Sequence, residues 1–595
     1  MSSVYRPAPA TSRGSSRLRI EPPMAERTAM ARIIRWPRYL HAVTERAKRW
    51  GVLPSYWSYQ GQLVETSTDT EAAILQAMGA SGERPPAVRR HSMPPGPCSA
   101  APNRAWGWAV QLYAVRSKDS WGIGDMGDLR RFARWSRSQG ASVLLLNPLG
   151  AQNPTLPYQP SPYYSSSRRF RNTLYLRVDD VDGAERCAAE LLPLRAEAQT
   201  LNERRLIDYD EVFRLKTRAL AAIFKAAPEP RGIEAWAKGK GRALRDFATY
   251  NALAEELGPA WRDWPAALRH PDAAALDGER RRLADRVAFH VWQQFHLDRQ
   301  MARAAREIDL ITDVPVGFAS DGFDSWRWQD LLAPGIRVGA PPDEFFPDGQ
   351  DWGLPPFDPW KLRRAHYEPF IEAVRSAAVH AAGIRLDHVM GLFRLFWIPS
   401  GSPPGGGAYV RYPAPDMLAL LALESRRAKA YVIGEDLGLV EPAVRKRLQA
   451  KSALSYRLLW FEGPTPDQWP KKAVAAVGTH DLPTLAGIWN LTEPDHRQHR
   501  LRHRLLEVAH APDGTPPVDV AVATYSALAA SQSCIALASL EDALGVEERP
   551  NVPGTTTEWP NWRLALPQAL DTIETADGTR RIAEVMRAHR PRRPS

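Results

Sequence analysis

The amino-acid sequence predicts an α/β fold: a (β/α)₈ TIM barrel with inserted helical subdomains and a small N-terminal extension domain. Three observations support this fold class. Strand-like apolar segments alternate with helical patterns from Trp106 onward. Eight such strand segments occur, which is the number that a closed parallel barrel needs. Three of them end in acidic residues, as expected where the ends of barrel strands form an active site.

The chain before the barrel divides into two parts. Residues 1–37 are rich in Arg and Ser and predict a disordered basic tail. Residues 38–104 predict a small N-terminal domain and a linker rich in Pro, Arg and Ser. Apolar spacing within this domain predicts two helices and, between them, a hairpin, at Tyr39–Trp50, Thr70–Met78 and Val52–Val64 respectively.

Residues 105–570 are expected to form the catalytic barrel, with inserted subdomains at about 150–305. A helix is predicted from about Met126 to Gln139, and residues 571–595 are expected to form a C-terminal helix and a second basic tail. Buried apolar runs predict the eight strands at Trp108–Val115, Ser142–Leu149, Leu310–Phe318, Gly383–Leu392, Ala430–Asp436, Ser455–Phe461, Ala473–Thr479 and Cys534–Leu540.

The formal charge of +11 suggests nucleic-acid binding, but its distribution argues against it. The first 40 residues carry eight Arg and two Glu, and the last sixteen carry six Arg and one Glu. Residues 41–579 are therefore formally neutral, whereas a phosphate-binding groove needs basic residues on the folded body. The sequence thus predicts no nucleic-acid partner.

Cysteine usage and hydropathy suggest the compartment. The three cysteines, Cys98, Cys187 and Cys534, are far apart and follow no C-x-x-C spacing, which argues against a disulfide framework or a cysteine zinc site. No apolar run is long enough for a membrane span, and the N-terminus lacks the apolar core of a secretory signal. We expect a cytoplasmic protein without a membrane partner.

Gly122–Gly127 reads G-x-G-x-x-G between a strand and a helix, the setting of a dinucleotide-binding fingerprint. That fingerprint also needs an acidic residue after the second strand, where this chain has Asn147. Asp125 would moreover point toward the pyrophosphate. We therefore interpret the segment as a tight strand-to-helix turn in which Asp125 or Asp128 caps the helix.

Three carboxylates carry the chemical prediction. Asp387, Glu435 and Asp481 each follow a predicted buried strand, so a parallel barrel brings them to one face. Two carboxylates can cleave a glycosidic bond with retention, one as nucleophile and one as acid/base. Taken alone, each motif is more often a structural hydrogen bond or a helix cap than a catalytic group. Three together favour catalysis, and no ligand spacing such as H-E-x-x-H suggests a metal.

Neighbouring residues fit this chemistry. Arg385 lies two residues before Asp387, so both side chains should face one side of the strand, and the guanidinium should keep Asp387 ionised. Glu435 must carry a proton on arrival, so burial and nearby carboxylates should raise its pKa. Asp481 could hold two sugar hydroxyls, with His388 and His480 as further hydroxyl ligands.

The chain resembles the amylomaltases, the 4-α-glucanotransferase family related to the α-amylases, over about residues 40–565. The resemblance includes the three acidic motifs and further segments: Ser120–Asp125, Ser161–Tyr163, Asp313–Gly317, Gly339–Asp343, Gly349–Pro356, Gly554–Thr556 and Pro560–Arg563. Asp351 stands where the family pattern has Asn. The Gly- and Pro-rich segment Pro399–Gly407 is expected to form a mobile lid on the acceptor side.

The resemblance implies transfer of α-1,4-glucan segments from a donor maltooligosaccharide to the 4-hydroxyl of an acceptor, through a covalent glycosyl-aspartate. It implies Asp387 as nucleophile, Glu435 as acid/base and Asp481 as transition-state stabiliser, with no cofactor and no metal. The implied substrate-binding residues are Arg385, His388, His480, Tyr163, Ser161, Asp343, Gln350, Trp352 and Trp397. A glucan hydrolase and a catalytically silent glucan-binding protein stay open as alternatives, and the sequence does not indicate the oligomeric state.

Overall fold

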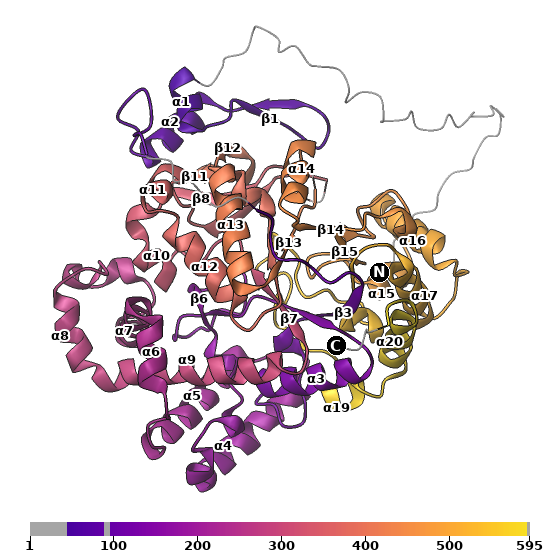
Figure 1. Ribbon diagram of the computed structural model, residues 1–595, viewed down its shortest axis with the longest axis horizontal. Coiled ribbons are helices and arrows are strands. Elements are labelled where there is room, and N and C mark those ends of the chain that lie inside the picture. The colour runs from indigo at the N-terminus through magenta and orange to yellow at the C-terminus, as the bar shows by residue number, and fades with distance from the viewer. Residues whose placement is uncertain (1–43, 89–95, 345, 439, 592–595) are drawn as a thin grey trace, which may run out of the picture. The chain divides into compact units, whose positions relative to one another are not determined.

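The structure, a computed structural model, describes residues 44–88, 96–344, 346–438 and 440–591 (Figure 1). These residues belong to one compact unit, Val43–Ser595. The predicted basic tail at 1–37 and the start of the first predicted helix lie outside the described residues. The predicted domain boundaries stay a prediction.

Eight parallel strands in the described part close into a barrel, which confirms the predicted fold class. Each strand pairs with the next along the chain, and β16 pairs with β3 to complete the circle. In chain order the strands are β3 (Ala105–Val110), β4 (Val143–Leu146), β7 (Asp309–Val314), β10 (Gly383–Leu386), β13 (Tyr431–Gly434), β14 (Leu454–Leu458), β15 (Ala473–Ala476) and β16 (Ile535–Ser539).

All eight predicted strands overlap a barrel strand, but their ends differ. The first was predicted at Trp108–Val115, whereas β3 ends at Val110 and a 3₁₀ turn follows at Leu112–Ala114. That turn is as buried as the strand, so hydrophobicity alone does not separate them. Similarly, the prediction at Gly383–Leu392 merges β10 with the 3₁₀ turn Val389–Leu392.

Helices surround the barrel, and the first confirms the interpretation of Gly122–Gly127. Helix α3 spans Met126–Ser138, and Asp125 and Asp128 form a capping box at its start. Gly124 is required by close packing, because a Cβ there would lie 2.0 Å from the carbonyl oxygen of Leu112. The later helices are α12 (Glu368–Ala378), α13 (Ala414–Ala428), α14 (Pro442–Ala450), α15 (Leu485–Trp489), α16 (His496–Ala509), α17 (Pro517–Ala530) and α18 (Leu540–Ala543).

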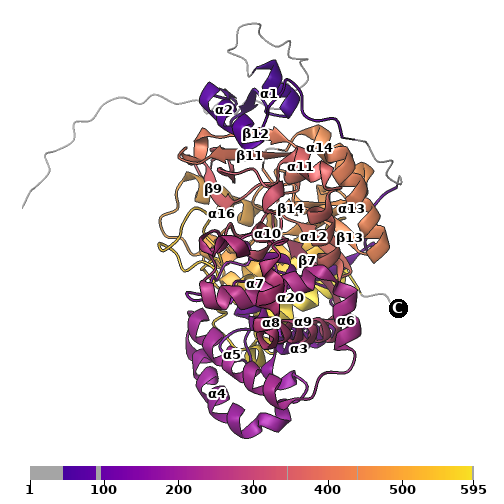
Figure 2. The ribbon, with the colours of Figure 1, turned by 90° about the vertical axis from the view of Figure 1, so that its left-hand side faces the viewer.

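The segment between β4 and β7 is rich in helices and gathers on one side of the barrel in both views (Figures 1 and 2). A buried ion cluster, Asp125, Asp128, Arg177 and Lys216, ties this segment to the start of α3. Its elements are β5 (Gly150–Ala151), β6 (Ser167–Arg171), α4 (Ala188–Thr200), α5 (Tyr209–Ala226), α6 (Ile233–Lys240), α7 (Arg242–Leu257), α8 (Ala275–Arg282) and α9 (Ala284–Ala305).

A second sheet, which the sequence did not predict, lies beside the barrel. Its order is β12 (Ala408–Arg411), β11 (Arg394–Pro399), β8 (Ile336–Ala340) and β9 (Gln350–Leu354), with α10 (Phe323–Arg327) and α11 (Pro359–Arg364) in the connecting segments. The N-terminal elements pack on it through Val52 and Val410. They are α1 (Glu45–Trp50), the predicted hairpin β1 (Ser55–Trp57) and β2 (Leu63–Glu65), and α2 (Thr68–Ala77).

The C-terminal elements are α19 (Leu570–Ile573) and α20 (Asp577–His589). The prediction placed all excess charge in tails, but several C-terminal arginines lie on the folded helix α20. Arg590 is buried and donates hydrogen bonds to the carbonyl oxygens of Ala105, Ala529 and Ser531. Among the described residues, no helix is long and apolar enough to cross a membrane.

Candidate active site

Asp387 directly follows β10, and Arg385 on that strand holds it in place. The Nη2 atom of Arg385 lies 3.0 Å from Oδ1 of Asp387. Its Nη1 atom lies 2.5 Å from Oδ2 of Asp313, which is the residue in register on the neighbouring strand β7. Arg385 is buried, with 4% of its side chain exposed, whereas 21% of the Asp387 side chain remains exposed. The expected pairing of Arg385 with Asp387 is therefore present.

Glu435 follows β13, the strand next to β10 in the barrel. The backbone N–H of His388 donates to Oε2 of Glu435 at 2.8 Å, and the N–H of Leu437 donates to Oε1 at 2.8 Å. The first of these bonds joins Glu435 to the residue directly after Asp387. The structure thus brings the two predicted catalytic carboxylates together.

Asp481 and His480 follow β15. Nε2 of His480 lies 3.2 Å from Oδ2 of Asp481, and Nδ2 of Asn551 donates to Oδ1 of Asp481 at 2.6 Å. Arg549 donates to the Asp481 backbone carbonyl at 3.1 Å. The side chain of Asp481 is 40% exposed, so it is fixed by its neighbours and still accessible.

Aromatic side chains connect the carboxylates. The hydroxyl of Tyr163 donates to Oδ2 of Asp313 at 2.6 Å and lies 3.4 Å from Nδ1 of His480. The Tyr163 and His480 rings are 4.7 Å apart between centroids, and both also contact the ring of Trp562. On the opposite side, Arg385 lies over the ring of Tyr456 at 5.7 Å. The network joins the ends of several barrel strands into one rigid site.

The environment shifts the pKa values of the two central carboxyls upward. Burial and, next, the charge of Asp387 raise the pKa of Glu435 to about 7. Burial also raises the pKa of Asp387 to about 6, although the guanidinium of Arg385 opposes the rise. Asp387 is thus still ionised at neutral pH, as expected, but burial outweighs the guanidinium, so its pKa is raised and not depressed.

The imidazole of His480 and the carboxyl of Asp481 stabilise each other's charges. Burial opposes ionisation of both, yet the ion pair raises the pKa of His480 and lowers that of Asp481. His388 differs, because burial and then the charge of Arg394 lower its pKa to about 4. His388 is therefore a neutral imidazole at neutral pH.

Other predicted substrate-binding residues lie in loops and in β9, and their contacts differ. The Trp352 ring contacts the His388 ring at 5.2 Å, and its indole N–H donates to Oε1 of Gln350 at 3.2 Å. Ser161 precedes Tyr163 in the loop, and its carbonyl accepts a hydrogen bond from the Gln152 side chain. Asp343 accepts a hydrogen bond from the Phe346 N–H within the loop before β9.

Trp397 does not fit its predicted role. Its side chain is fully buried in β11, within the core under the four-stranded sheet. No ring surface is left for a sugar, so Trp397 is not carried into the functional proposal.

The sequence interpretation missed three residues that hold the site together: Asp313, Asn551 and Trp562. Asp313 had a detectable signal, because it lies near the end of the predicted strand Leu310–Phe318, as Asp387 does near the end of its own. Asn551 lies in an irregular segment after β16, where no periodicity marks it. Trp562 lies in the same segment, within Pro560–Arg563, which the family resemblance includes, but no role was predicted for it. Among the described residues, no group of three or more His, Cys, Asp or Glu side chains is arranged to hold a metal ion.

The fold places the chain among the (β/α)₈-barrel enzymes, which have their active sites at the C-terminal ends of the strands. Residues 110–570 match the model of a family described as 4-alpha-glucanotransferase. The chain therefore belongs to the 4-α-glucanotransferase family, and its activity is that of a 4-α-glucanotransferase. The resemblance to the amylomaltases is confirmed.

Individual relatives agree with the family. A 4-alpha-glucanotransferase of Mycobacterium tuberculosis is 40% identical over 552 residues, covering 83% of this chain and 76% of that one. One from Haemophilus influenzae is 32% identical, covering 79% and 76% of the two chains. The crystal structure of amylomaltase from Corynebacterium glutamicum superimposes with a TM-score of 0.81 at 25% identity, covering 93% of this chain and 99% of that one.

Proposed function

We propose that the enzyme moves α-1,4-glucan segments from a donor maltooligosaccharide to the 4-hydroxyl of an acceptor glucan or glucose by a retaining double displacement. Asp387 is the nucleophile, Glu435 the acid/base and Asp481 the stabiliser of the transition state. The observation that carries this assignment is the unequal partnering of two adjacent carboxyls. Asp387 has a guanidinium 3.0 Å away, whereas the hydrogen bonds that the Glu435 carboxyl accepts from described residues come from the backbone N–H groups of His388 and Leu437.

This inequality decides which carboxyl keeps the proton. Two neighbouring carboxyls in a buried site cannot both ionise without repulsion, so one proton stays on the member with the less stabilised anion. Burial and the Asp387 charge raise the pKa of Glu435 to about 7. At neutral pH Asp387 is therefore mostly ionised while a substantial fraction of Glu435, about half at pH 7, keeps its proton, as a retaining mechanism requires.

In the first displacement, Asp387 attacks the anomeric carbon of the donor. Arg385 contacts Oδ1 and leaves Oδ2 to form the new bond. The bond from the anomeric carbon to the leaving oxygen breaks, and Glu435 transfers its proton to that oxygen. The shorter glucan leaves, and the donor segment stays attached to Asp387 as a glycosyl ester.

In the second displacement, the acceptor 4-hydroxyl enters where the first product left. Glu435, now ionised, takes the hydroxyl proton as the oxygen bonds to the anomeric carbon and the ester bond to Asp387 breaks. Two inversions give net retention. Asp481, held by Asn551 and His480, can accept hydrogen bonds from two ring hydroxyls and carries a charge that stabilises the oxocarbenium-like transition state.

The experiment is incubation of the purified protein with maltotriose alone, followed by mass analysis of the sugars. A ladder of longer maltooligosaccharides together with glucose is expected, because each transfer lengthens one chain and shortens another. Only glucose and maltose would show that water is the acceptor and would contradict the transfer mechanism. Unchanged maltotriose would contradict maltotriose as a donor and favour a silent binding protein.

A further inference from the structure

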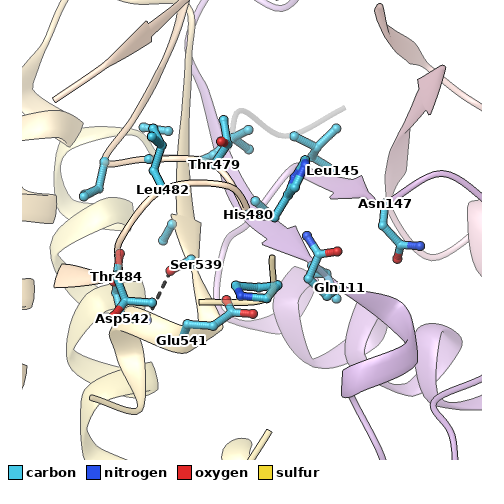
Figure 3. Close-up of a pocket in the computed structure, with 18 of the residues that line it drawn as sticks. Gln111, Leu145, Asn147, Thr479, His480, Leu482, Thr484, Ser539, Glu541 and Asp542 are labelled. Carbon is cyan, nitrogen blue, oxygen red and sulfur yellow. Dashed lines mark hydrogen bonds between the residues drawn. The ribbon is translucent and has the colours of Figure 1, made fainter. Parts of the chain in front are cut away.

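A pocket adjoins the catalytic carboxylates at the ends of β3, β4, β15 and β16. Arg385, Tyr163 and His480 line it on the side of the catalytic network. Gln111 follows β3, and Glu541 follows β16 in the short helix α18. Figure 3 shows the side chains of Gln111, His480 and Glu541 around a common space. The proposed mechanism assigns no role to Gln111 or Glu541.

Several other polar side chains of the pocket are hydrogen-bonded within the protein. Asn147 accepts a hydrogen bond from the Leu112 N–H at 2.8 Å and donates to the Tyr175 hydroxyl at 3.1 Å. Asp542 accepts from the Tyr525 hydroxyl at 2.6 Å and from the Leu485 N–H at 2.8 Å. These groups hold the barrel together, so they are not available to a ligand.

Gln111 and Glu541 differ from these residues. The Oε1 atom of Gln111 is buried and has no hydrogen-bond partner in the described part of the chain. The Glu541 carboxyl lines the same pocket and accepts a hydrogen bond from its own backbone N–H, and burial raises its pKa to about 7. Buried polar groups without partners are rare because each costs free energy. The unpartnered Oε1 of Gln111, together with the Glu541 carboxyl in the same pocket, points to a polar ligand.

Barrel topology indicates which part of the substrate enters this pocket. In the closed order β10-β13-β14-β15-β16-β3-β4-β7, β3 lies four strands from β13, on the opposite side. Glu435 at the end of β13 protonates the leaving oxygen, so the leaving and acceptor sugars lie on that side. The reacting donor ring therefore extends across the barrel mouth toward the ends of β3 and β16.

We propose that Gln111 and Glu541 bind hydroxyl groups of the donor glucosyl ring that reacts with Asp387. This proposal rests on the mechanism given above. A sugar hydroxyl both donates and accepts, so it can donate to Oε1 of Gln111 and either accept from protonated Glu541 or donate to its carboxylate. The pair would orient the donor ring and favour glucose over sugars that lack these hydroxyls.

The test is calorimetric titration of maltotriose into the Asp387→Asn enzyme, in which donor binding is not followed by turnover. Adding Glu541→Ala or Gln111→Ala should each weaken binding about tenfold, the equivalent of one lost neutral hydrogen bond. Glu541→Gln keeps a neutral hydrogen-bonding group and should stay within about threefold. Glu547→Ala is the matched control, because Glu547 lies in the same segment as Glu541 and is exposed, and its carboxyl accepts a hydrogen bond from Asn490; affinity should not change.

Unchanged affinity in both alanine variants would overturn the proposal. So would equal weakening in Glu541→Gln and Glu541→Ala together with a lower melting temperature in both, because that pattern describes a structural carboxyl. Failure of the mechanism itself looks different: the Asp387→Asn enzyme would still convert maltotriose, or would not bind it, before any pocket residue is changed. Either result would overturn both proposals.

Discussion

Two buried clusters of charge, one at the start of α3 and one at the ends of the barrel strands, differ in the balance of acids and bases. In the ion cluster at the start of α3, Asp125 and Asp128 face Arg177 and Lys216. Arg177 lies 2.7 Å from Asp125 and 2.6 Å from Asp128, and Ser117 and Ser120 also donate to Asp128. Two carboxylates thus meet two cations, so the formal charges balance, although burial and the charge of Asp125 raise the pKa of Asp128 to about 6.

The catalytic cluster is unbalanced. Four carboxylates, those of Asp313, Asp387, Glu435 and Asp481, share one guanidinium and one imidazole. The surplus of acids means that one proton must remain, and the least compensated carboxyl, Glu435, holds it. A buried cluster with equal numbers of acids and bases stabilises the fold. A buried cluster with surplus carboxyls keeps a proton that it can transfer.

Removing the nucleophile is expected to have the largest effect. Asp387→Asn should lower kcat for maltotriose by about 10⁴-fold or more, because no covalent intermediate can form. The melting temperature should stay within a few degrees of the parent, since the exchange relieves acid repulsion. A kcat of the Asp387→Asn enzyme within tenfold of the parent value would contradict the assignment of Asp387 as nucleophile.

Removing a cation from the balanced cluster at the start of α3 should lower the free energy of unfolding and leave kcat unchanged. Arg177→Met leaves Asp125 and Asp128 without their main partner and should cost about 3–5 kcal/mol of unfolding free energy, measured by chemical denaturation. kcat per folded molecule should be unchanged. Arg186→Met, which alters an exposed arginine of the same inserted segment, is the control and should cost less than about 0.5 kcal/mol. An equal loss of unfolding free energy in the two variants would show that the buried ion pairs of Arg177 do not stabilise the fold more than an exposed arginine does.

Loosening one carboxylate of the catalytic cluster should give an intermediate effect. Asn551→Ala removes the 2.6 Å hydrogen bond to Asp481 and should lower kcat/KM by about 10- to 100-fold, the range for a hydrogen bond to a charged group. Asn490→Ala removes an exposed bond of the same type and length to Glu547 and should have no effect. Similar kinetics for the two variants would argue against a role for Asn551 in holding Asp481.

The dependence of kcat/KM on pH should show which carboxyl of the catalytic cluster keeps its proton. Activity needs Asp387 ionised and Glu435 protonated, with pKa values raised to about 6 and about 7. kcat/KM should therefore fall about tenfold per unit as pH decreases below about 6, when Asp387 binds a proton. It should fall similarly as pH increases above about 7, when Glu435 loses its proton. A kcat/KM that increases between pH 7 and 9 would contradict the assignment of Glu435.

The sequence predicted the barrel because its strands are continuous apolar runs, and it predicted Asp387, Glu435 and Asp481 because each follows such a run directly. The pairing of Arg385 with Asp387 followed from strand alternation. These are local patterns. Asp313 reaches Arg385 only through the register between β7 and β10, which a single sequence does not contain.

Other features escaped prediction for similar reasons. The four-stranded sheet pairs β8 with β11, although β9, α11, α12 and the barrel strand β10 lie between them in the chain, so no short-range pattern predicts the pairing. The family resemblance implied that Trp397 binds substrate, but its burial in the core depends on tertiary packing, which the sequence does not show. The end of β3 was misplaced because the buried turn after it is as apolar as the strand.

The most direct test of Asp387 as the nucleophile is to identify the residue that becomes glycosylated. The enzyme would be incubated with 5-fluoro-α-glucosyl fluoride, whose ring fluorine slows both displacements while its good leaving group keeps the first one accessible, and its peptides analysed by mass spectrometry. The account predicts one fluoroglucosyl group, on the peptide that contains Asp387, and none in the Asp387→Asn enzyme. An adduct on another carboxylate would contradict the assignment of Asp387, and so would the absence of any adduct during continued turnover of the reagent.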